Sequence, residues 1–331
     1  LLTSTSKKLH WDTKKMPTVL NAPTWNSNAS KGLQLGGVQH GTGSHTAREY
    51  NHSNIQKGKA SIHHLSLEAK SAMLYDAMKT GHIKTLTDLF EAGVSPNLMD
   101  PLSSDTPMMA ACRQGRTDIV QLCLQFGGRN DPHPDFGQTA LHAAIATRNV
   151  TCGRLLLSAA SESGADVIIT NLTDPRGQTP LHVACSNGDA ASTSVLLHHG
   201  AQVETLDINQ ATPLLVAAQA GNIKVFNALF EYGADVTIDH VDINKWTALH
   251  HTSERGYYDC VELLLQTAAD CTIRDKNNHK PYDIALMNNN TEIATLLTEY
   301  DSESHSSSSS RRSVGFDTFG SSSSSMVKPS E

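Results

Sequence analysis

The sequence predicts an all-α solenoid, in which helix-turn-helix units joined by short hairpin-like turns stack in a row. Three observations lead to this fold class. A four-residue segment that starts with Thr recurs at spacings of 33, 40, 33 and 35 residues. Glycine recurs nine residues after the Thr position in most copies, and apolar clusters fall between the glycines. A fixed period of this length is typical of repeat proteins, whose units contact only their neighbours.

The repeated segment has five clear copies and two weaker ones along the 331-residue chain. The weaker copies begin at Ala72 and Lys280. We therefore expect about seven units, of which the outer two are degenerate. The clear copies are Thr106-Pro107-Met108-Met109, Thr139-Ala140-Leu141-His142, Thr179-Pro180-Leu181-His182, Thr212-Pro213-Leu214-Leu215 and Thr247-Ala248-Leu249-His250.

The residues of one unit explain its expected helices. Thr179 is suited to cap the first helix, and Pro180 fits the first turn because its missing N–H has no helical partner there. Gly188 then ends the first helix, and Gly200 ends the second in a position suited to a left-handed backbone. Helices of roughly ten residues are marginal alone. Each unit must therefore stack on its neighbours to bury its apolar faces.

The Thr-Pro-Leu-His segments, the Ala-Ala-like pairs that follow them and the Gly-Ala-Asp turns at 164–166 and 233–235 resemble ankyrin repeats. The resemblance covers residues 67–300. It implies that His142, His182 and His250 hydrogen-bond the backbone and connect adjacent units. It also implies that a partner protein binds the turn tips and the inner face of each first helix.

Three units depart from the common pattern, and the fifth of the seven carries two extra residues near Asp239 to Val241. The third unit is seven residues longer than its neighbours, which we interpret as longer surface loops around Ser158–Ser163 and before Pro175. In the sixth unit Thr252 and Ser253 replace the small Ala pair. We expect lower local stability in the last two units.

The segments outside the repeats have a different composition. Residues 1–65 carry 8 Lys/Arg against 2 Asp/Glu, and we expect residues 1–66 to form a disordered basic arm. Residues 301–331 contain two runs of five serines, and we expect a disordered Ser-rich tail. Ser313 follows Arg311-Arg312 and is a candidate phosphorylation site for a basophilic kinase.

Several classes of function lack their sequence patterns. No apolar run approaches the roughly 18 residues of a membrane span, and the first fifteen residues lack the apolar run of a secretory signal, so we expect neither membrane insertion nor secretion. The six cysteines show no zinc-site spacing, and metalloprotease, nucleophile-elbow and phosphate-loop motifs are missing. The middle of the chain is acidic, with 15 Lys/Arg against 27 Asp/Glu, which disfavours nucleic acid. We expect no catalytic, cofactor or metal residues, and a location in the cytoplasm or the nucleus.

Candidate partner-binding residues follow from the resemblance, by their offsets from each Thr. Phe136 and Trp246 stand out, because an exposed aromatic tip is either covered by a partner or packed on the next turn. Both alternatives stay open for Trp246. Arg113, Arg176 and Arg255 could bond a partner carboxylate. The full set is Arg113, Gln114, Asp135, Phe136, Gln138, Arg176, Gln178, Asn187, Asn209, Gln219, Asn244, Trp246, Arg255, Lys276 and His279.

These observations predict a non-catalytic adaptor or scaffold that binds another protein through its concave face. We expect a monomeric repeat domain. The alternative is the regulatory array of a larger enzyme, such as a kinase, a GTPase-activating protein, an acyltransferase or a ubiquitin-ligase adaptor, whose catalytic domain lies outside this chain.

Overall fold

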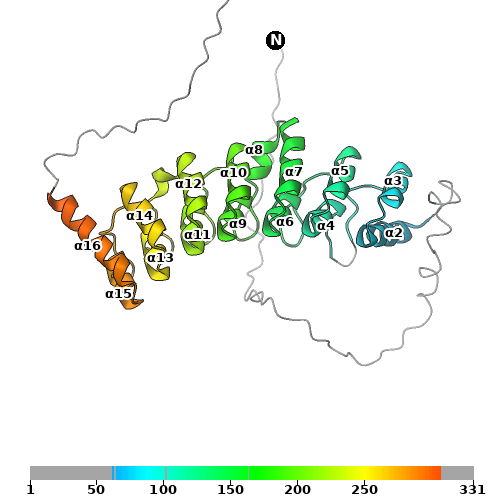
Figure 1. Cartoon of the computed structure of the whole chain (residues 1–331). Coiled ribbons are helices and arrows are strands. Elements are labelled where there is room, and N and C mark those ends of the chain that lie inside the picture. Colours follow the sequence, from blue (N-terminus) through cyan, green and yellow to red (C-terminus); the bar gives the residue numbers. More distant parts are fainter. Residues whose placement is uncertain (1–61, 63–64, 101–102, 163, 307–331) are drawn as a thin grey trace, which may run out of the picture. The chain divides into compact units, whose positions relative to one another are not determined.

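The computed structural model describes residues 62, 65–100, 103–162 and 164–306, in which helices joined by turns and loops are the regular secondary structure (Figure 1). Seven helix pairs follow one another there, and we number them as units 1 to 7. The first helices are α2 (Leu67–Thr80), α4 (Pro107–Gln114), α6 (Ala140–Ala146), α9 (Pro180–Ser186), α11 (Pro213–Ala220), α13 (Ala248–Arg255) and α15 (Pro281–Met287). The second helices are α3 (Ile83–Glu91), α5 (Thr117–Gln125), α7 (Val150–Glu162), α10 (Ala190–His198), α12 (Ile223–Glu231), α14 (Tyr258–Gln266) and α16 (Thr291–Ser306).

The recurring Thr residues cap the first helices, as their positions predict. The Thr212 side chain accepts the backbone N–H of Leu215 at 3.3 Å, and Pro213 occupies the first turn. In the units that carry His, the imidazole forms a second capping hydrogen bond. In unit 4, for example, Nδ1 of His182 accepts the backbone N–H of Thr179 at 3.2 Å. The two bonds satisfy backbone groups that a helix start leaves open.

The same imidazoles connect neighbouring units through hydrogen bonds to the backbone, which confirms the role that the resemblance implies for them. With Nδ1 acting as an acceptor, Nε2 carries the proton and donates to the carbonyl of the next turn. His142 donates to Gln178 O at 3.1 Å, His182 to Ala211 O at 3.1 Å and His250 to His279 O at 3.3 Å.

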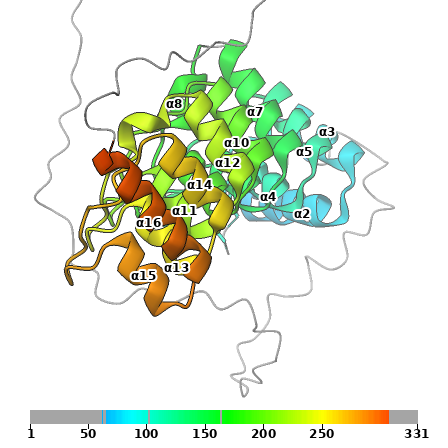
Figure 2. The same ribbon diagram turned by 60° about the vertical axis from the view of Figure 1, so that its left-hand side comes forward.

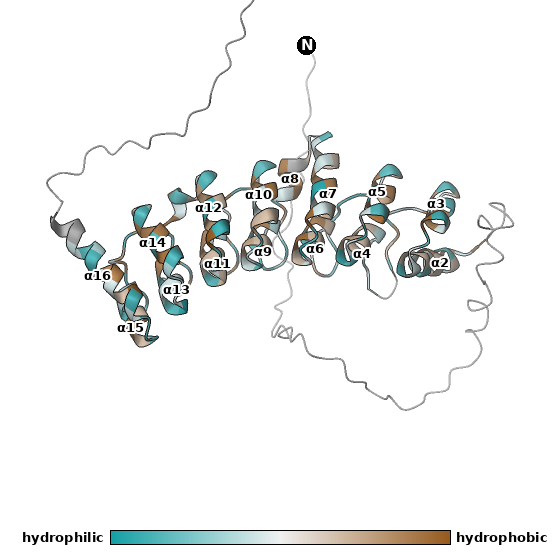
Figure 3. Ribbon diagram, in the orientation of Figure 1, coloured by the Kyte–Doolittle hydropathy of each residue, from teal (hydrophilic) through white to brown (hydrophobic). Residues whose placement is uncertain are grey.

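The units stack in chain order into two helix layers. First helices pack on first helices from α2 to α15, and second helices form the other layer, as Figures 1 and 2 show. Aliphatic residues fill the space within and between the pairs, and Phe226 is the largest of the fully buried side chains. In Figure 3 most helices carry both hydrophobic and hydrophilic residues. Burial between units supplies the stability that such short helices lack alone.

The insertion in unit 3 is largely helical, so the expectation of a longer loop from Ser158 was wrong, whereas residues 171–174, directly before Pro175, are not helical. It extends α7 to 13 residues, where α5 and α10 have nine, and adds the short helix α8 (Asp166–Thr170). The added turn contains Ala159, Ala160 and Glu162, and alanine and glutamate favour helix. Asn171, at the end of α8, ties the insertion to unit 4 because its Nδ2 donates to Gly200 O at 3.1 Å. In unit 5 the two extra residues, near Asp239 to Val241, follow a short 3₁₀ helix, η2 (Ala234–Thr237).

The boundaries of the repeat region are only partly described. Helix α16 continues to Ser306, past residue 300 at which the sequence interpretation ends the repeats. The basic arm, apart from a few of its last residues, and the tail beyond Ser306, with Ser313, lie outside the described residues.

The Ser253 side chain in α13 marks a weak point in unit 6. Its hydroxyl is fully buried and has no hydrogen-bond partner among the described residues. Ala218 occupies the equivalent position in unit 5 and is also fully buried. We expect Ser253→Ala to raise the free energy of unfolding by about 1 kcal/mol, because it removes an unsatisfied buried polar group.

Urea unfolding followed by circular dichroism measures this effect. Ser192→Ala is the matched control, because Ser192 is equally buried but donates its hydroxyl to Asp189 Oδ2. The control should lower the free energy of unfolding. Equal effects of the two substitutions would contradict the assignment.

Candidate functional site

The turn that precedes each of the last four units is a closed five-residue loop built on an aspartate. In the loop before unit 4, Asp174 Oδ1 accepts the backbone N–H groups of Arg176 and Gln178 at 2.8 and 2.9 Å. The backbone N–H of Asp174 donates to Gln178 O at 2.9 Å and closes the loop. The loops before units 5, 6 and 7 have the same two carboxylate bonds. They are built on Asp207, Asp242 and Asp275.

The fourth residue of each loop has a left-handed backbone. Gly177 has this conformation with φ of 72°, and a Cβ there would approach the Asp207 Cα to 3.2 Å. The equivalent residues Gln210, Lys245 and Asn278 have φ of 57°, 61° and 68°. The left-handed residue turns the chain back toward the helix start, and glycine also lets two loops approach closely.

Backbone hydrogen bonds join the four loops into a row, which we call the tip row (residues 174–178, 207–211, 242–246 and 275–279). The Ile208 N–H donates to Arg176 O at 2.9 Å, and the Ile243 N–H donates to Asn209 O at 3.0 Å. Lys276 N–H continues the pattern with Asn244 O at 3.2 Å. The row begins at unit 4, because Pro175 stands where the other loops have a donor and has no N–H.

The sequence interpretation missed the four aspartates that build these loops. They are buried, and each lies five residues before a Thr position or its equivalent, Lys280. That spacing is as regular as the Thr segments and could have identified them. Burial raises the pKa of Asp242, but hydrogen bonds from His251 and two backbone N–H groups outweigh it and hold the pKa below its ordinary value. For Asp275 burial likewise raises the pKa, but hydrogen bonds from two backbone N–H groups and from Trp246 outweigh it and hold the pKa below its ordinary value.

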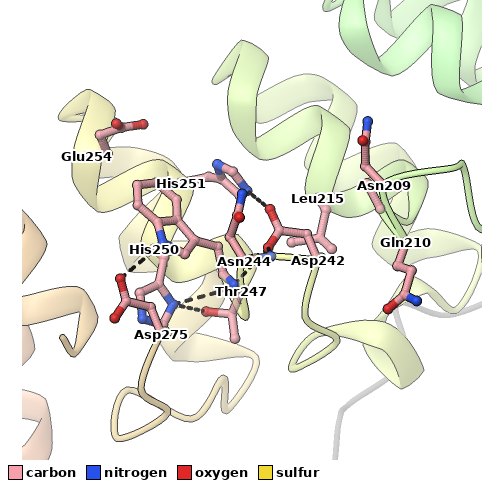
Figure 4. Close-up of polar contacts among 12 residues, drawn as sticks. Asn209, Gln210, Leu215, Asp242, Asn244, Thr247, His250, His251, Glu254 and Asp275 are labelled. Atoms are coloured by element: carbon pink, nitrogen blue, oxygen red, sulfur yellow. Dashed lines mark hydrogen bonds and ion pairs between the residues drawn. The ribbon is translucent and has the colours of Figure 1, made fainter. Parts of the chain in front are cut away.

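Trp246 has the contacts of a residue that packs between tips. Its ring is partly buried, and Nε1 donates to Asp275 Oδ2 of the next loop at 3.2 Å. The ring centroid lies 5.0 Å from that of His251, whose Nε2 lies 3.3 Å from Asp242 Oδ2. Figure 4 shows His251 of α13 facing Asp242, and Asp275 beside the same helix. Trp246 thus joins loops 242–246 and 275–279 to α13.

The tip before unit 3 is built differently. His133 takes the place of the aspartate, and its Nδ1 accepts the N–H groups of Asp135 and Phe136 at 3.1 and 3.2 Å. The Phe136 ring is 59% exposed and lies 4.8 Å from the imidazole, centroid to centroid. Asp135 is exposed, and Gln138 is partly buried, with its carbonyl bonded to His133 N.

The remaining predicted residues divide between the tip row and the ends of the first helices. In the tip row Arg176, Asn209, Asn244 and Lys276 are exposed, whereas Gln178 and His279 are partly buried. At the helix ends Arg113, Gln114, Gln219 and Arg255 are exposed, and Asn187 is partly buried. An eight-residue helix is about 12 Å long, which separates the two sets.

Some helix-end residues already have partners in the chain. Arg113 reaches back along α4 to Asp105, with Nη2 and Oδ1 3.0 Å apart. Arg255 Nε lies 3.7 Å from Glu254 Oε2. Asn187 Nδ2 donates to Ile145 O of unit 3 at 3.2 Å and so connects two units. Gln114 and Gln219 are therefore the helix-end residues whose side chains are most open to a partner.

The described residues offer no group of three or more His, Cys, Asp or Glu placed to hold a metal ion. Within the same part of the chain no helix is both long and apolar enough to cross a membrane. Five of the six cysteines are buried and Cys271 is partly buried, all with free thiols. Burial raises the pKa of Cys123 to about 12 and that of Cys260 to about 11, which makes both thiols poor nucleophiles.

Comparison with known proteins identifies the repeat. The family model described as ankyrin repeats (3 copies) matches residues 74–171, 163–240 and 238–307. The human SH3 and multiple ankyrin repeat domains protein 2 is 28% identical over 258 residues, which are 76% of this chain and 13% of that protein. The tyrosine-protein kinase HTK16 of Hydra vulgaris is 29% identical over 165 residues, or 49% of this chain and 21% of that protein. The chain therefore spans only a small part of these relatives.

A solved structure supports the same assignment. The crystal structure of the ankyrin repeat domain of Bcl-3, titled a unique member of the IkappaB protein family, superposes with a TM-score of 0.58 at 25% identity. The match covers 67% of this chain and 97% of that domain. The repeat period, the capped helix pairs, the bonded tips and these matches lead to one conclusion: the chain belongs to the ankyrin-repeat family.

Proposed function

We propose that this chain is a non-catalytic adaptor or scaffold, which binds a partner protein along its turn tips and the inner faces of its first helices. The observation that carries the proposal is the tip row. Hydrogen bonds between loops occupy the backbone, so the side chains of the row are what a partner would contact. Phe136, Ile208 and Ile243 leave 59%, 64% and 44% of their surface exposed at the tips. Exposed apolar side chains held on a rigid scaffold are typical of protein interfaces.

Affinity capture with the full chain tests this proposal. The test variant is Phe136→Ala, Asn209→Ala, Asn244→Ala, which removes uncharged side chains at three tips. Its matched control is Tyr258→Ala, Gln121→Ala, Asn227→Ala, which removes one exposed aromatic and two exposed amides from the second helices. Retained proteins are identified by mass spectrometry, and binding is then measured with the purified partner.

We expect the tip variant to weaken that partner's binding about tenfold or more, and the control to change it less than twofold. Circular dichroism checks that both variants fold. Equal loss in the two variants, or unchanged binding to the tip variant, would reject the tips as the binding face.

The second candidate function is a regulatory array within a larger enzyme. The observation that favours it is length, because the chain spans 21% of a tyrosine-protein kinase and 13% of another relative. The same tips would then contact a catalytic domain of that enzyme. Sequencing the complete transcript distinguishes the two functions, since an in-frame catalytic domain favours the enzyme and a frame without one favours the adaptor.

A further inference from the structure

The tips of units 4 to 7 differ in charge from the rest of the array. Their exposed part, which we call the tip strip, comprises residues 175–177, 208–210, 243–245 and 276–278. The charged side chains that reach solvent along it are all cationic: Arg176, Lys245 and Lys276. The loop aspartates lie beneath the strip, buried, and each holds two backbone N–H groups through one oxygen. A partner on the strip therefore meets positive charges at the surface.

The charged side chains on the second helices, which form the other layer, are mainly acidic in units 5 and 6. In the second helices of units 5 and 6 and in η2, Lys224 is the basic residue, and the exposed acidic residues are Glu231, Asp235, Asp259 and Glu262. Like charges repel, so an acidic ligand is disfavoured on the second helices and directed to the strip.

Aliphatic side chains alternate with the cations. Ile208 lies between Arg176 and Lys245 along the strip, and Ile243 directly precedes Asn244 and Lys245. Both isoleucines are largely exposed. Asn209, Asn244 and Asn277 directly follow Ile208, Ile243 and Lys276 in the sequence. Their side-chain amides can hydrogen-bond the backbone of an extended ligand. The strip thus offers charge, apolar contact and hydrogen bonding in turn.

Lys245 supports a role for the strip in binding. It occupies the left-handed position of its loop with φ of 61°, as Gln210 does in the loop before unit 5 with φ of 57°, whereas the loops before units 4 and 7 have Gly177 and Asn278 there. A long side chain in that backbone region is unfavourable, and such residues concentrate at functional sites. The lysine side chain is exposed, so packing within the array does not account for it.

We propose that the tip strip binds an acidic, extended segment of the partner protein, in which aliphatic residues lie on Ile208 and Ile243 and carboxylates lie on Arg176, Lys245 and Lys276. This inference rests on the proposed function and specifies the partner's chemistry. Stacked units lie roughly 10 Å apart. The strip from Arg176 to Lys276 therefore matches about nine residues of extended chain.

A nucleic acid fits the strip less well. Nucleic acids carry a charge about every few ångströms, and three cations over roughly 30 Å neutralise few of them. The two isoleucines also have no counterpart on a phosphate backbone. The strip is matched to a peptide in which charge and aliphatic side chains alternate.

Selection from a random twelve-residue peptide library displayed on phage, with the full chain as bait, tests the proposal. We expect the enriched peptides to carry net negative charge and aliphatic residues. A fluorescein-labelled copy of an enriched peptide is then titrated by fluorescence anisotropy at 50 and 200 mM salt. The affinity should fall as the salt concentration rises.

Charge reversal locates the site. The variant Arg176→Glu, Lys245→Glu, Lys276→Glu should weaken the peptide about tenfold or more. The control Lys84→Glu, Arg154→Glu, Lys224→Glu makes the same charge change on exposed positions of the second helices and should alter binding less than twofold. If the reversal variant does not fold, Arg176→Gln, Lys245→Gln, Lys276→Gln replaces it, with a smaller loss expected.

Three outcomes would overturn the inference: enriched peptides without net negative charge, equal weakening by both charge reversals, or displacement of the peptide by polyuridylic acid at lower concentration than by unlabelled peptide. These outcomes leave the proposed function standing if the uncharged tip variant still loses the captured partner. Loss of neither partner nor peptide in any tip variant would reject both.

Discussion

Lowering the pH below about 6.5 should destabilise the helix array steeply. Burial lowers the pKa of His142, His182 and His250 below the ordinary imidazole value, although hydrogen bonds to carbonyls oppose this effect. The unfolded chain takes up protons on these groups near pH 6.5, and the folded chain does not. Stability is therefore full above that pH and falls as the pH drops toward the lower folded pKa.

The slope of this loss sets its size. Each imidazole contributes up to about 1.4 kcal/mol per pH unit, so the three together contribute up to about 4 kcal/mol per pH unit. Asp242 and Asp275, whose pKa values are held low, add a loss in the same direction only near and below pH 4. Urea unfolding followed by circular dichroism, at half-unit steps from pH 7.5 to 5, measures the slope.

The chain provides the matched variant for this test. Leu215 occupies in unit 5 the position that His182 occupies in unit 4. His182→Leu should lower stability at pH 7.5, because it removes the bonds to Thr179 and Ala211, and should reduce the slope by about a third. A slope that stays the same in this variant would show that the buried imidazoles do not cause the acid sensitivity.

Phe226→Ala should lower the free energy of unfolding by about 3–5 kcal/mol, the usual effect of emptying a buried aromatic site. Phe226 lies in α12 with no exposed surface, and its ring meets Phe230 edge-on at 6.2 Å. Helix α12 packs between α10 and α14, so the cavity weakens the contacts of unit 5 with both neighbours. Because stability in such arrays is a sum over neighbouring interfaces, units on the two sides of unit 5 should unfold separately.

Urea unfolding and hydrogen exchange measure this result. Two transitions should replace one, and amides of units 5 to 7 should exchange faster than those of units 2 to 4. Phe136→Ala is the matched control, since this exposed tip phenylalanine should change stability by less than about 1 kcal/mol. A single transition with a small shift in Phe226→Ala would mean that the stack tolerates the cavity.

The sequence alone was sufficient for the repeat period, the helix pairs and the family resemblance. These features depend on interactions within a few residues. Thr179 and Thr212 reach backbone groups three residues ahead, and Gly221 ends a helix through its own left-handed backbone. Local chemistry of this kind is written in the order of residues, so the repeated Thr and Gly positions identified the helix boundaries.

The candidate site was predicted less completely, because it depends on contacts between units. The insertion in unit 3 was interpreted as loop, but it extends α7 and forms α8, and Asn171 directly after α8 donates a hydrogen bond to the Gly200 carbonyl of unit 4. The contacts of Trp246 could not be predicted from the sequence, because Asp275, to which its Nε1 donates, lies 29 residues away along the chain. The regular aspartates were visible in the sequence but had no interpretation without the loops that they close.

The sequence by itself determined the seven helix pairs and the Thr and Gly positions that start and end most of them, but not the extension of α7 or the short helix α8. Only the tertiary structure decided which tip side chains pack, which reach solvent, and that the tips form one bonded row. The physical reason is separation along the chain. Helix caps join residues three or four apart, whereas the tip row joins residues about thirty apart, and stacking alone sets those distances.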